Sequence, residues 1–404
     1  MAKGFLAPLM TWLVAMLLAL PATSVKAAPR TPSDDAEVLE RLPIQAGARA
    51  RGELAALRLA ARREPASIEA ALRLAEFLFA QALAQGDPRP VGQAEAELRR
   101  VAGPAAEASA AWLSLRGQLR QYRHDFDGAL ADLAAALRRD PTLAEAHSWR
   151  GAIYLVQADL GAARAECEAL GRLQRDILRA GCLGLAQAYG GQLAQADRTL
   201  AQGQADAALT ETQQWFLTRR GEVAGWRGLP VDAERHYRAA QQLGLDDAYR
   251  LAAHADFLLD QGRPAEVLRL LAGWDNADPL LLRIAEAESA LKLPQLQARL
   301  DALAERFAAA GQRGDTTHRA EEARYWLGLR GDPARALALA RANYTVQREP
   351  RDARVLLECA LAARDPAAAA PAIDWLRRSG FEDARLRDLA RRLGATDLKP
   401  VAGS

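Results

Sequence analysis

The chain has 404 residues, with 53 Lys and Arg against 51 Asp and Glu and a formal net charge of +2. A single hydrophobic core seldom serves so many residues, so this length leaves several domains or one elongated array. The balanced charge, with only short basic runs such as Arg391-Arg392, argues against nucleic-acid binding, which requires a basic stripe facing the phosphates.

The first 27 residues have the features of a secretory signal peptide. Lys3 gives a positive start, an apolar run covers Phe5–Leu20, and Val25-Lys26-Ala27 fits the small-x-small pattern of a cleavage site. The apolar run is shorter than the roughly 20 residues of a membrane span. We therefore expect cleavage after Ala27 or Ala28 and a periplasmic or secreted protein that is not integral to the membrane. The alternative is that the segment is kept as an amino-terminal anchor.

From about residue 66 the sequence repeats with a period near 34 residues, which is typical of units made of two helices. Arg116-Gly117 recurs as Arg150-Gly151 and as Arg220-Gly221. We align the repeats on the small residue in the middle of each first helix. The last two repeats have a larger residue at this position and align less clearly, and the alignment gives nine units. The aligned residues are Ala75, Gly117, Gly151, Gly184, Gly221, Ala255, Ala285, Arg324 and Leu357.

The second half of most units begins with a turn or capping residue, then Phe, Leu or Pro, and usually Ala three residues later. Asp accepts hydrogen bonds from the free amide groups of a helix start, and Pro at the first helical position loses no hydrogen bond. The pattern therefore predicts where each second helix begins. The turn or capping residues that open this pattern in seven of the units are Asp125, Asp159, Gln192, Leu229, Arg263, Asp332 and Asp365.

Small residues are expected where the two helices of a unit cross closely, because a larger side chain would hold the backbones apart. The expected pairs are Gly117 with Ala129, Gly151 with Ala163, and Gly221 with Ala233. Larger residues at helical spacing would fill the seam to the next unit, namely Leu133, Tyr154, Leu200, Tyr237 and Leu271.

Trp112-x-x-Leu115, Gly151-x-x-Tyr154, Ala233-x-x-x-Tyr237 and Pro141 resemble the tetratricopeptide (TPR) signature, and the resemblance covers roughly residues 66–377. It implies an all-α fold, a right-handed α-α superhelix of about nine helix-turn-helix repeats with terminal capping helices. It also implies a non-catalytic protein without a cofactor, which binds a partner in the concave groove lined by the first helices.

The repeats are irregular in two places, at an insertion spanning residues 86–90 and around residues 275–315, where we expect a break in the superhelix. Capping helices are expected near 53–63 and 381–393. The expected order is a signal peptide at 1–27, a flexible segment at 28–50, an amino-terminal array at 51–274, a carboxy-terminal array with its cap at 275–394, and a flexible tail at 395–404.

Cys167, Cys182 and Cys359 are an odd number, so at most one internal disulfide forms. Cys167 and Cys182 fall on neighbouring helices and could bridge. We favour the simpler interpretation, in which each cysteine is a small buried apolar residue, because a solenoid core can be built without a crosslink.

The chemistry-bearing residues of this sequence form no recognisable catalytic or metal-binding motif. The five histidines lie at different repeat positions, and His147 and His254 occupy positions normally used for packing. Asn343 begins a formal glycosylation sequon but falls on a helix-crossing position, so we expect it to be buried.

Groove candidates follow from the repeat positions that face inward in the TPR resemblance. Aromatic side chains there would anchor a peptide or a sugar, or else pack between the first helices. Four acids at one inner repeat position form a modest acidic stripe. The candidates are Tyr122, Tyr189, Trp215, Trp226, Tyr249 and Tyr325, with Glu222, Asp256, Glu286 and Glu358.

Two functions fit these features. The first is an exported scaffold that binds a protein or extended peptide in the bacterial cell envelope. The second is a carbohydrate-binding or accessory subunit of an envelope enzyme complex, in which groove aromatics stack on sugar rings. A catalytic role for the acidic stripe is the weakest of the alternatives, since such stripes usually face solvent.

Overall fold

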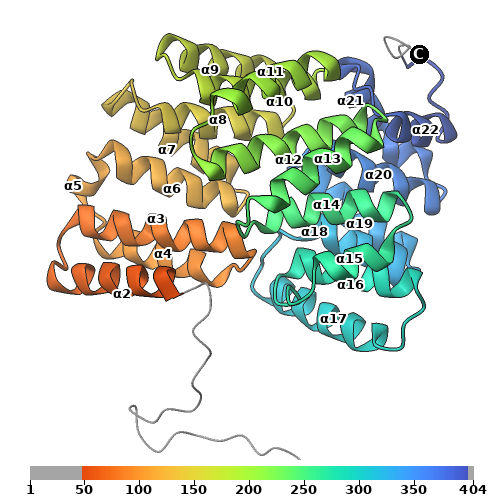
Figure 1. Cartoon of the computed structure of the whole chain (residues 1–404), viewed down its shortest axis with the longest axis horizontal. Coiled ribbons are helices and arrows are strands. Elements are labelled where there is room, and N and C mark those ends of the chain that lie inside the picture. The colour runs from red at the N-terminus through yellow and green to blue at the C-terminus, as the bar shows by residue number, and fades with distance from the viewer. Residues whose placement is uncertain (1–47, 399–404) are drawn as a thin grey trace, which may run out of the picture. The chain divides into compact units, whose positions relative to one another are not determined.

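The structure, a computed structural model, describes residues 48–398, and every regular element in that range is helical (Figure 1). The predicted all-α fold is confirmed. The predicted signal peptide at 1–27, the segment 28–47 and residues 399–404 lie outside the described residues. The first described helix, α2 (Ala48–Arg63), begins three residues before the predicted array, and the residues from Glu53 onward form one unit.

Within the described residues, successive helices pack in nine helix-turn-helix pairs, which is the predicted number of repeats. The first helices of the pairs are α3 (Ile68–Gln85), α6 (Ala110–Tyr122), α8 (Ala144–Val156), α10 (Asp176–Tyr189), α12 (Thr210–Trp226), α14 (Ala248–Asp260), α16 (Asp278–Ala290), α18 (Arg319–Arg324) and α20 (Pro350–Ala362). The second helices are α4 (Arg89–Arg100), α7 (Phe126–Arg139), α9 (Leu160–Arg172), α11 (Leu193–Asp206), α13 (Pro230–Gln242), α15 (Pro264–Leu270), α17 (Leu296–Gln312), α19 (Pro333–Tyr344) and α21 (Ala370–Ser379).

Four short elements complete the succession. A single turn, α5 (Pro104–Glu107), follows the first pair, and a π-helical stretch, η1 (Tyr325–Leu329), extends α18. A short 3-10 turn, η2 (Pro366–Ala369), leads into α21. The last helix, α22 (Ala384–Arg392), matches the predicted carboxy-terminal capping helix, as α2 matches the amino-terminal one.

The second helices begin where the sequence predicts, and at the aspartates a capping hydrogen bond forms as expected, whereas Gln192, Leu229 and Arg263 make no such bond. The Asp125 carboxylate accepts from the Gly128 amide at 3.1 Å, and Asp159 accepts from Ala162 at 3.0 Å. Asp332 caps α19 in the same way. Because these contacts involve residues only three apart, the local sequence is sufficient to place them.

Close helix crossings occur at the predicted glycines, although the neighbours differ in part. A Cβ added at Gly117 would lie 2.9 Å from the Leu133 side chain and 3.2 Å from the Ala129 carbonyl oxygen, as expected. At Gly151 the nearest atom is instead the Cys182 sulfur, at 3.3 Å. Most of the expected seam residues are buried, with Tyr154 half-buried.

Cys167 on α9 and Cys182 on α10 are joined by a disulfide, with their Cα atoms 5.5 Å apart. Our preference for three unbridged cysteines was therefore wrong. Cys359 is a buried free thiol, as expected. The bridge forms because the turn between α9 and α10 brings Cys182 against the buried Cys167, a placement that spacing alone does not determine.

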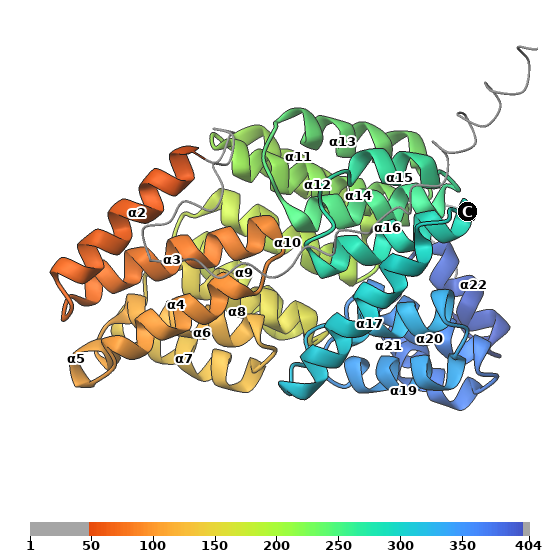
Figure 2. The same ribbon diagram turned by 90° about the horizontal axis from the view of Figure 1, so that it is seen from below.

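The carboxy-terminal repeats pack against the middle repeats, so that one hydrophobic cluster includes residues from Leu155 to Ala395 (Figures 1 and 2). The Arg348 amide donates to the Val156 carbonyl oxygen at 2.7 Å, and Gly191 lies against the backbone of Gly380. Ala395 belongs to this cluster, and so part of the predicted flexible tail is packed. The predicted break near 275–315 stays a prediction, because these contacts do not test how the two arrays move.

Candidate binding surface

The first helices of distant repeats meet one another on one side of the array, and we call this side the inner face. Tyr189 of α10 contacts Glu349 at the start of α20, Asp256 of α14 contacts Arg324 of α18, and Asp260 of α14 contacts Arg354 of α20. Every one of these residues belongs to or borders a first helix, and the first helices are those that the sequence analysis expects to line the groove.

Tyr189 and Trp226, two of the predicted aromatics, come together on the inner face. Their ring centroids are 6.1 Å apart, and Phe381 packs on the Trp226 ring at 5.4 Å. The Tyr189 hydroxyl donates to Glu349 Oε1 at 3.0 Å. Tyr189 is only 4% exposed, so of the two alternatives for this ring the structure favours packing over an open anchor: the residues between α21 and α22 already cover this part of the inner face.

Trp215 and Tyr249 lie on either side of one arginine. The Arg219 guanidinium carbon is 4.2 Å from the Tyr249 ring centroid and 5.4 Å from that of Trp215. Glu222 completes the group: it accepts from the Tyr249 hydroxyl at 2.6 Å and from Arg219 at 3.0 Å. Both aromatic rings are half-buried. Burial raises the pKa of Tyr249 even though the Arg219 charge opposes this shift.

Tyr122 and Tyr325 lie apart from that group. Tyr122 is half-buried against the edge of Phe79, and burial raises its pKa to about 12. Tyr325 is 1% exposed, packs on Phe307 and donates its hydroxyl to the Leu300 carbonyl oxygen at 3.2 Å. For Tyr325 too the structure favours the packed alternative, because this ring at the start of the π-helical turn lies in the core against Phe307 of α17.

The predicted acidic stripe is neutralised by arginines. Arg324 pairs with both Asp256, at 2.9 Å, and Glu286, at 2.7 Å. Arg283 pairs with the second oxygen of Asp256. Burial alone would raise the pKa of Asp256, but the charges of Arg283 and Arg324 outweigh it and hold this pKa well below its usual value. Asp256 is thus an ionised counter-ion at neutral pH.

The other members of the stripe are paired as well. Glu358 accepts from Arg354 at 2.8 Å, and Arg354 also forms two hydrogen bonds to Asp260. The Glu222 pair with Arg219 is described above. Charge-assisted pairs of this kind hold the facing helices in register but leave little negative potential for a basic partner.

The start of α20 adds a second group of charges. Asp352 accepts from the Glu349 amide at 3.0 Å and from the Asn343 side chain at 2.9 Å, and burial raises the pKa of Asp352 to about 7. Asn343 is buried, as predicted. Arg351 pairs with Glu349 at 2.9 Å, yet its side chain remains 54% exposed. Of the other arginines paired with inner-face acids, four are between 6% and 31% exposed and Arg385, which pairs with Asp260, is 40% exposed, so Arg351 is the most exposed of these cations.

The histidines have structural surroundings. His254 is buried, and its ring stacks on Tyr237 with centroids 5.0 Å apart. His147 pairs with Glu166 at 2.6 Å. Between residues 48 and 398 there is no group of three or more His, Cys, Asp or Glu side chains that could hold a metal ion. Within the same range, no helix combines the length and the apolar character of a bilayer span.

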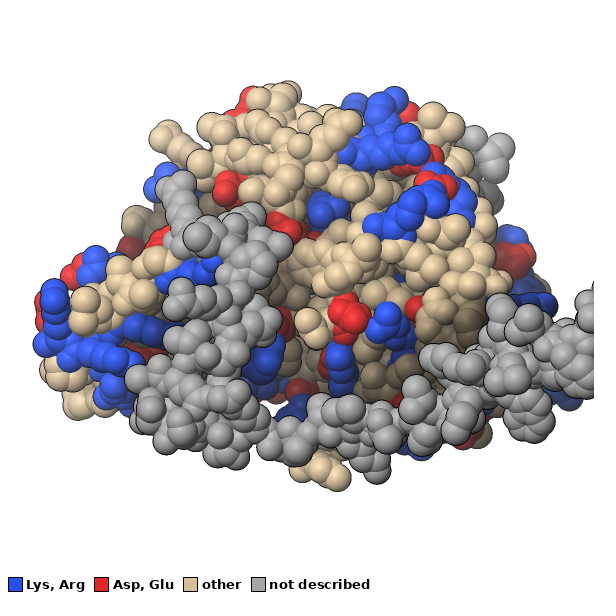
Figure 3. Space-filling model, turned by 60° about the horizontal axis from the view of Figure 1, so that its bottom comes forward, with Lys and Arg blue, Asp and Glu red and all other residues tan. Residues whose placement is uncertain are grey.

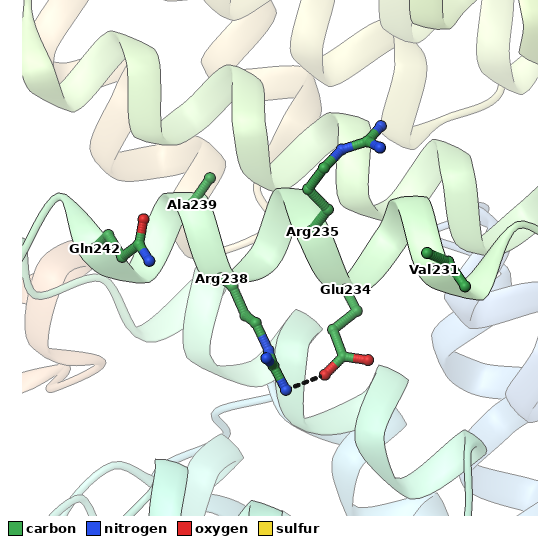
Figure 4. Close-up of a pocket in the computed structure, with 6 residues that line it drawn as sticks. All are labelled: Val231, Glu234, Arg235, Arg238, Ala239 and Gln242. Carbon is green, nitrogen blue, oxygen red and sulfur yellow. Dashed lines mark ion pairs between the residues drawn. The ribbon is translucent and has the colours of Figure 1, made fainter.

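Two recesses lie away from the inner face. One, of about 470 Å³, runs along the outer side of α13 and is lined by that helix alone, with Glu234 and Arg238 paired across it (Figure 4). The other, of about 520 Å³, lies between α2 and the pair α3–α4, and its rim carries Arg58, Arg62 and Arg100. Neither recess was predicted from the sequence.

The arginines that pair with the acidic stripe were not among the predicted groove residues. Arg219 and Arg354 precede Glu222 and Glu358 by three and four residues, a helical spacing that does indicate ion pairs. Arg324 could not have been found in this way, because its partner Asp256 lies 68 positions earlier in the chain.

The sequence matches no family model, and no curated protein matches it. Solved structures do resemble it. A chain in the crystal structure of the APC/C hetero-tetramer Cut9–Hcn1 aligns with a TM-score of 0.51 and 12% identity, over 86% of this chain and 67% of that chain. The P58(IPK) TPR domain has a TM-score of 0.22 and 14% identity, over 80% of this chain and 96% of that chain. A chain in the structure of Naa15/Naa10 bound to HypK-THB has a TM-score of 0.26 and 15% identity, over 85% of this chain and 63% of that chain. At these identities the first likeness shows the fold alone, the two lower TM-scores add nothing to it, and the chain has the fold of a TPR solenoid.

Proposed function

We propose that this chain is an exported, non-catalytic scaffold of the bacterial cell envelope that binds a protein or extended peptide on its inner face. Solenoids of this type present extended surfaces, and scaffolds for protein–protein interaction commonly have this fold. The observation that carries the proposal is the accessible Arg351 side chain on a face that also bears the half-buried Trp226 and Tyr249. Arg, Trp and Tyr are the residue types enriched where proteins bind one another.

The disulfide between Cys167 and Cys182 supports export. Disulfides persist in oxidising compartments and are rare in the reducing cytosol. The signal-like segment at residues 1–27 points the same way. Determination of the mature amino terminus tests this part of the proposal: a chain that still begins at Met1 in purified material would contradict it.

The paired acids support a non-catalytic role. A general acid must hold a proton near neutral pH and reach a substrate. The pKa of Asp256 is kept far below that range by Arg283 and Arg324, and Asp352, whose pKa is raised, is 2% exposed and already bound by Asn343 and the Glu349 amide. The carbohydrate-binding alternative requires an aromatic ring with an open face. Trp226 contacts both Tyr189 and Phe381, while Trp215 packs against Phe216 and Arg219, so neither ring favours that alternative.

Photocrosslinking in living cells tests the inner-face proposal. A photoreactive amino acid replaces Arg351 in one variant and, as the control, the outer residue Arg235, whose side chain is 65% exposed (Figure 4). The expected result is a defined protein adduct from position 351 and none from position 235. Adducts from position 235 alone would show that partners bind the outer surface, and the inner-face proposal would be wrong.

A further inference from the structure

The recess between α2 and α3–α4, which we call the α2 groove, combines an apolar floor with a basic rim. Ala61, Leu74 and Leu78 form the floor and are 6%, 3% and 3% exposed. The groove measures about 520 Å³, enough for one or two large side chains and the backbone that carries them. Burying an apolar side chain of a partner on such a floor favours the complex, because apolar surface is removed from water.

The rim of the α2 groove has an excess of positive charge. Its one acid, Glu97, is already paired with Arg100 at 2.8 Å. Arg58 donates to the neutral amide of Gln93 at 3.0 Å, and among residues 48–398 neither Arg58 nor Arg62 has a carboxylate oxygen within 4 Å. This differs from the inner face, where each arginine described above has an acidic partner. Within the part of the chain that the structure describes, two guanidinium groups of the α2 groove therefore lack an acidic partner.

The rest of α2 extends the basic character of the groove. The helix contains five arginines and one glutamate, and its Leu59 side chain is 48% exposed beside Arg58. Figure 3 shows Lys and Arg side chains gathered at the amino-terminal end, on the left of that view. An apolar side chain and several acids of one partner would thus find matching groups close together.

We propose that the α2 groove binds an acidic peptide segment of a partner protein. One apolar side chain of the segment would lie over Ala61, Leu74 and Leu78, and its carboxylates would pair with Arg58 and Arg62. Guanidinium groups bind carboxylates in a planar, bidentate geometry, and complementary charge across an interface favours such partners over neutral ones. The groove is separate from the inner face, so this inference does not rest on the function proposed above.

An acidic peptide fits the groove better than a nucleic acid does. Glu97 stands on the rim, and Glu64 follows the two terminal arginines of α2. A phosphate backbone would meet these carboxylates, whereas a short peptide can place its acids beside Arg58 and Arg62 alone. The apolar floor also has no role in binding a phosphate backbone.

Fluorescence anisotropy with three labelled probe peptides tests the proposal. The first is a short peptide with a central leucine flanked by Asp and Glu, the second has Asn and Gln in place of the acids, and the third has serine in place of the leucine. The purified protein is expected to bind the first peptide, more weakly at high salt, and to bind the other two at least about tenfold more weakly.

Two double variants identify the site. Replacing Arg58 and Arg62 by Glu is expected to weaken binding of the first peptide by about tenfold or more, while Arg58→Lys with Arg62→Lys retains binding. The matched control replaces Arg138 and Arg139, which are exposed at the end of α7, by Glu and should leave binding unchanged. All four side chains are exposed, and unchanged circular dichroism and melting temperature would confirm that the variants fold.

Several outcomes would overturn the inference: no binding of the acidic peptide up to about 1 mM, equal binding of the amide peptide, or equal loss in the control variant. Tighter binding of a single-stranded oligonucleotide at the same arginines would show that phosphate is the ligand instead. Crosslinking at position 351 in the Arg58→Glu, Arg62→Glu variant separates the two proposals, because the inner face should be unaffected.

Discussion

Glycines at the crossings of first and second helices set how closely the two backbones approach. At Gly221 of α12, an added Cβ would lie 2.9 Å from the ring of the buried Tyr237, whereas at Gly225 of the same helix it would meet nothing within 4 Å. The repeat pattern predicted the need for a small residue at Gly221. The atom that Gly221 makes room for became known only with the structure.

We predict opposite effects of alanine at these two glycines. Gly221→Ala should lower the free energy of unfolding by about 1–3 kcal/mol, because the Tyr237 ring must shift in a packed core. Gly225→Ala should raise it by about 0.5–1 kcal/mol, because alanine favours the helix and the position is open. Urea denaturation followed by circular dichroism measures both, and a shift of the two variants in the same direction would contradict the crossing geometry.

His254 provides a test at the same scale through pH. Burial lowers its pKa from 6.5 to about 4 in the folded protein. The unfolded chain therefore binds the proton more readily, so this residue makes the folded state less stable as pH falls from about 6.5 towards 4. His254→Phe keeps a ring against Tyr237 but cannot titrate.

Between pH 7 and pH 4.5, wild type should therefore lose about 2 kcal/mol more unfolding free energy than His254→Phe does. Urea unfolding of both proteins at the two pH values gives the comparison. Equal losses would mean that the imidazole is not held neutral in the folded state.

At the scale of elements, the starts of the second helices were predicted and the irregular elements were not. Asp159 and Asp332 each cap a helix by accepting a hydrogen bond from the amide three residues later, and a local sequence pattern is enough to specify such a contact. The π-helical turn at Tyr325–Leu329 was not foreseen, because it depends on how Tyr325 packs against α17 rather than on nearby residues.

The disulfide is the strongest link between two neighbouring elements, α9 and α10. Replacing both Cys167 and Cys182 by Ala should destabilise the protein by about 3 kcal/mol, since the bridge closes a loop with a sequence separation of 15. Thermal melting with and without reductant measures the effect. Reductant should lower the melting temperature of the wild type to near that of the double variant and leave the variant unchanged; a wild type insensitive to reductant would contradict the bridge.

At the scale of the whole unit, contacts between distant repeats determine which inner residues are accessible. Gly191, at the turn after α10, has a φ of +74°, and an added Cβ would lie 2.5 Å from the Gly380 carbonyl oxygen. Gly228, at the turn after α12, has a φ of +71° but open space around it. The two glycines share the same left-handed backbone conformation and differ in the distant contact.

This pair allows the packing of the carboxy-terminal repeats to be tested directly. Gly228→Ala should lower the free energy of unfolding by about 1 kcal/mol, because alanine is strained at a positive φ. Gly191→Ala should lower the free energy of unfolding by more than Gly228→Ala does. It should also accelerate hydrogen exchange in α20–α22, because Gly380 must move away from the added methyl group. Identical exchange in the two variants would show that the contact between α10 and the carboxy-terminal repeats does not hold these elements together.

The sequence by itself determined the all-helical repeat architecture, the nine units and most helix starts. The physical reason is that caps, small residues at crossings and the apolar spacing of helices are local and recur with each unit. Only the tertiary structure decided that Tyr189 is covered and that the acidic stripe is paired. Those outcomes depend on contacts such as Tyr189 with Glu349, 160 positions apart, which form when the superhelix brings distant repeats together and which no local pattern encodes.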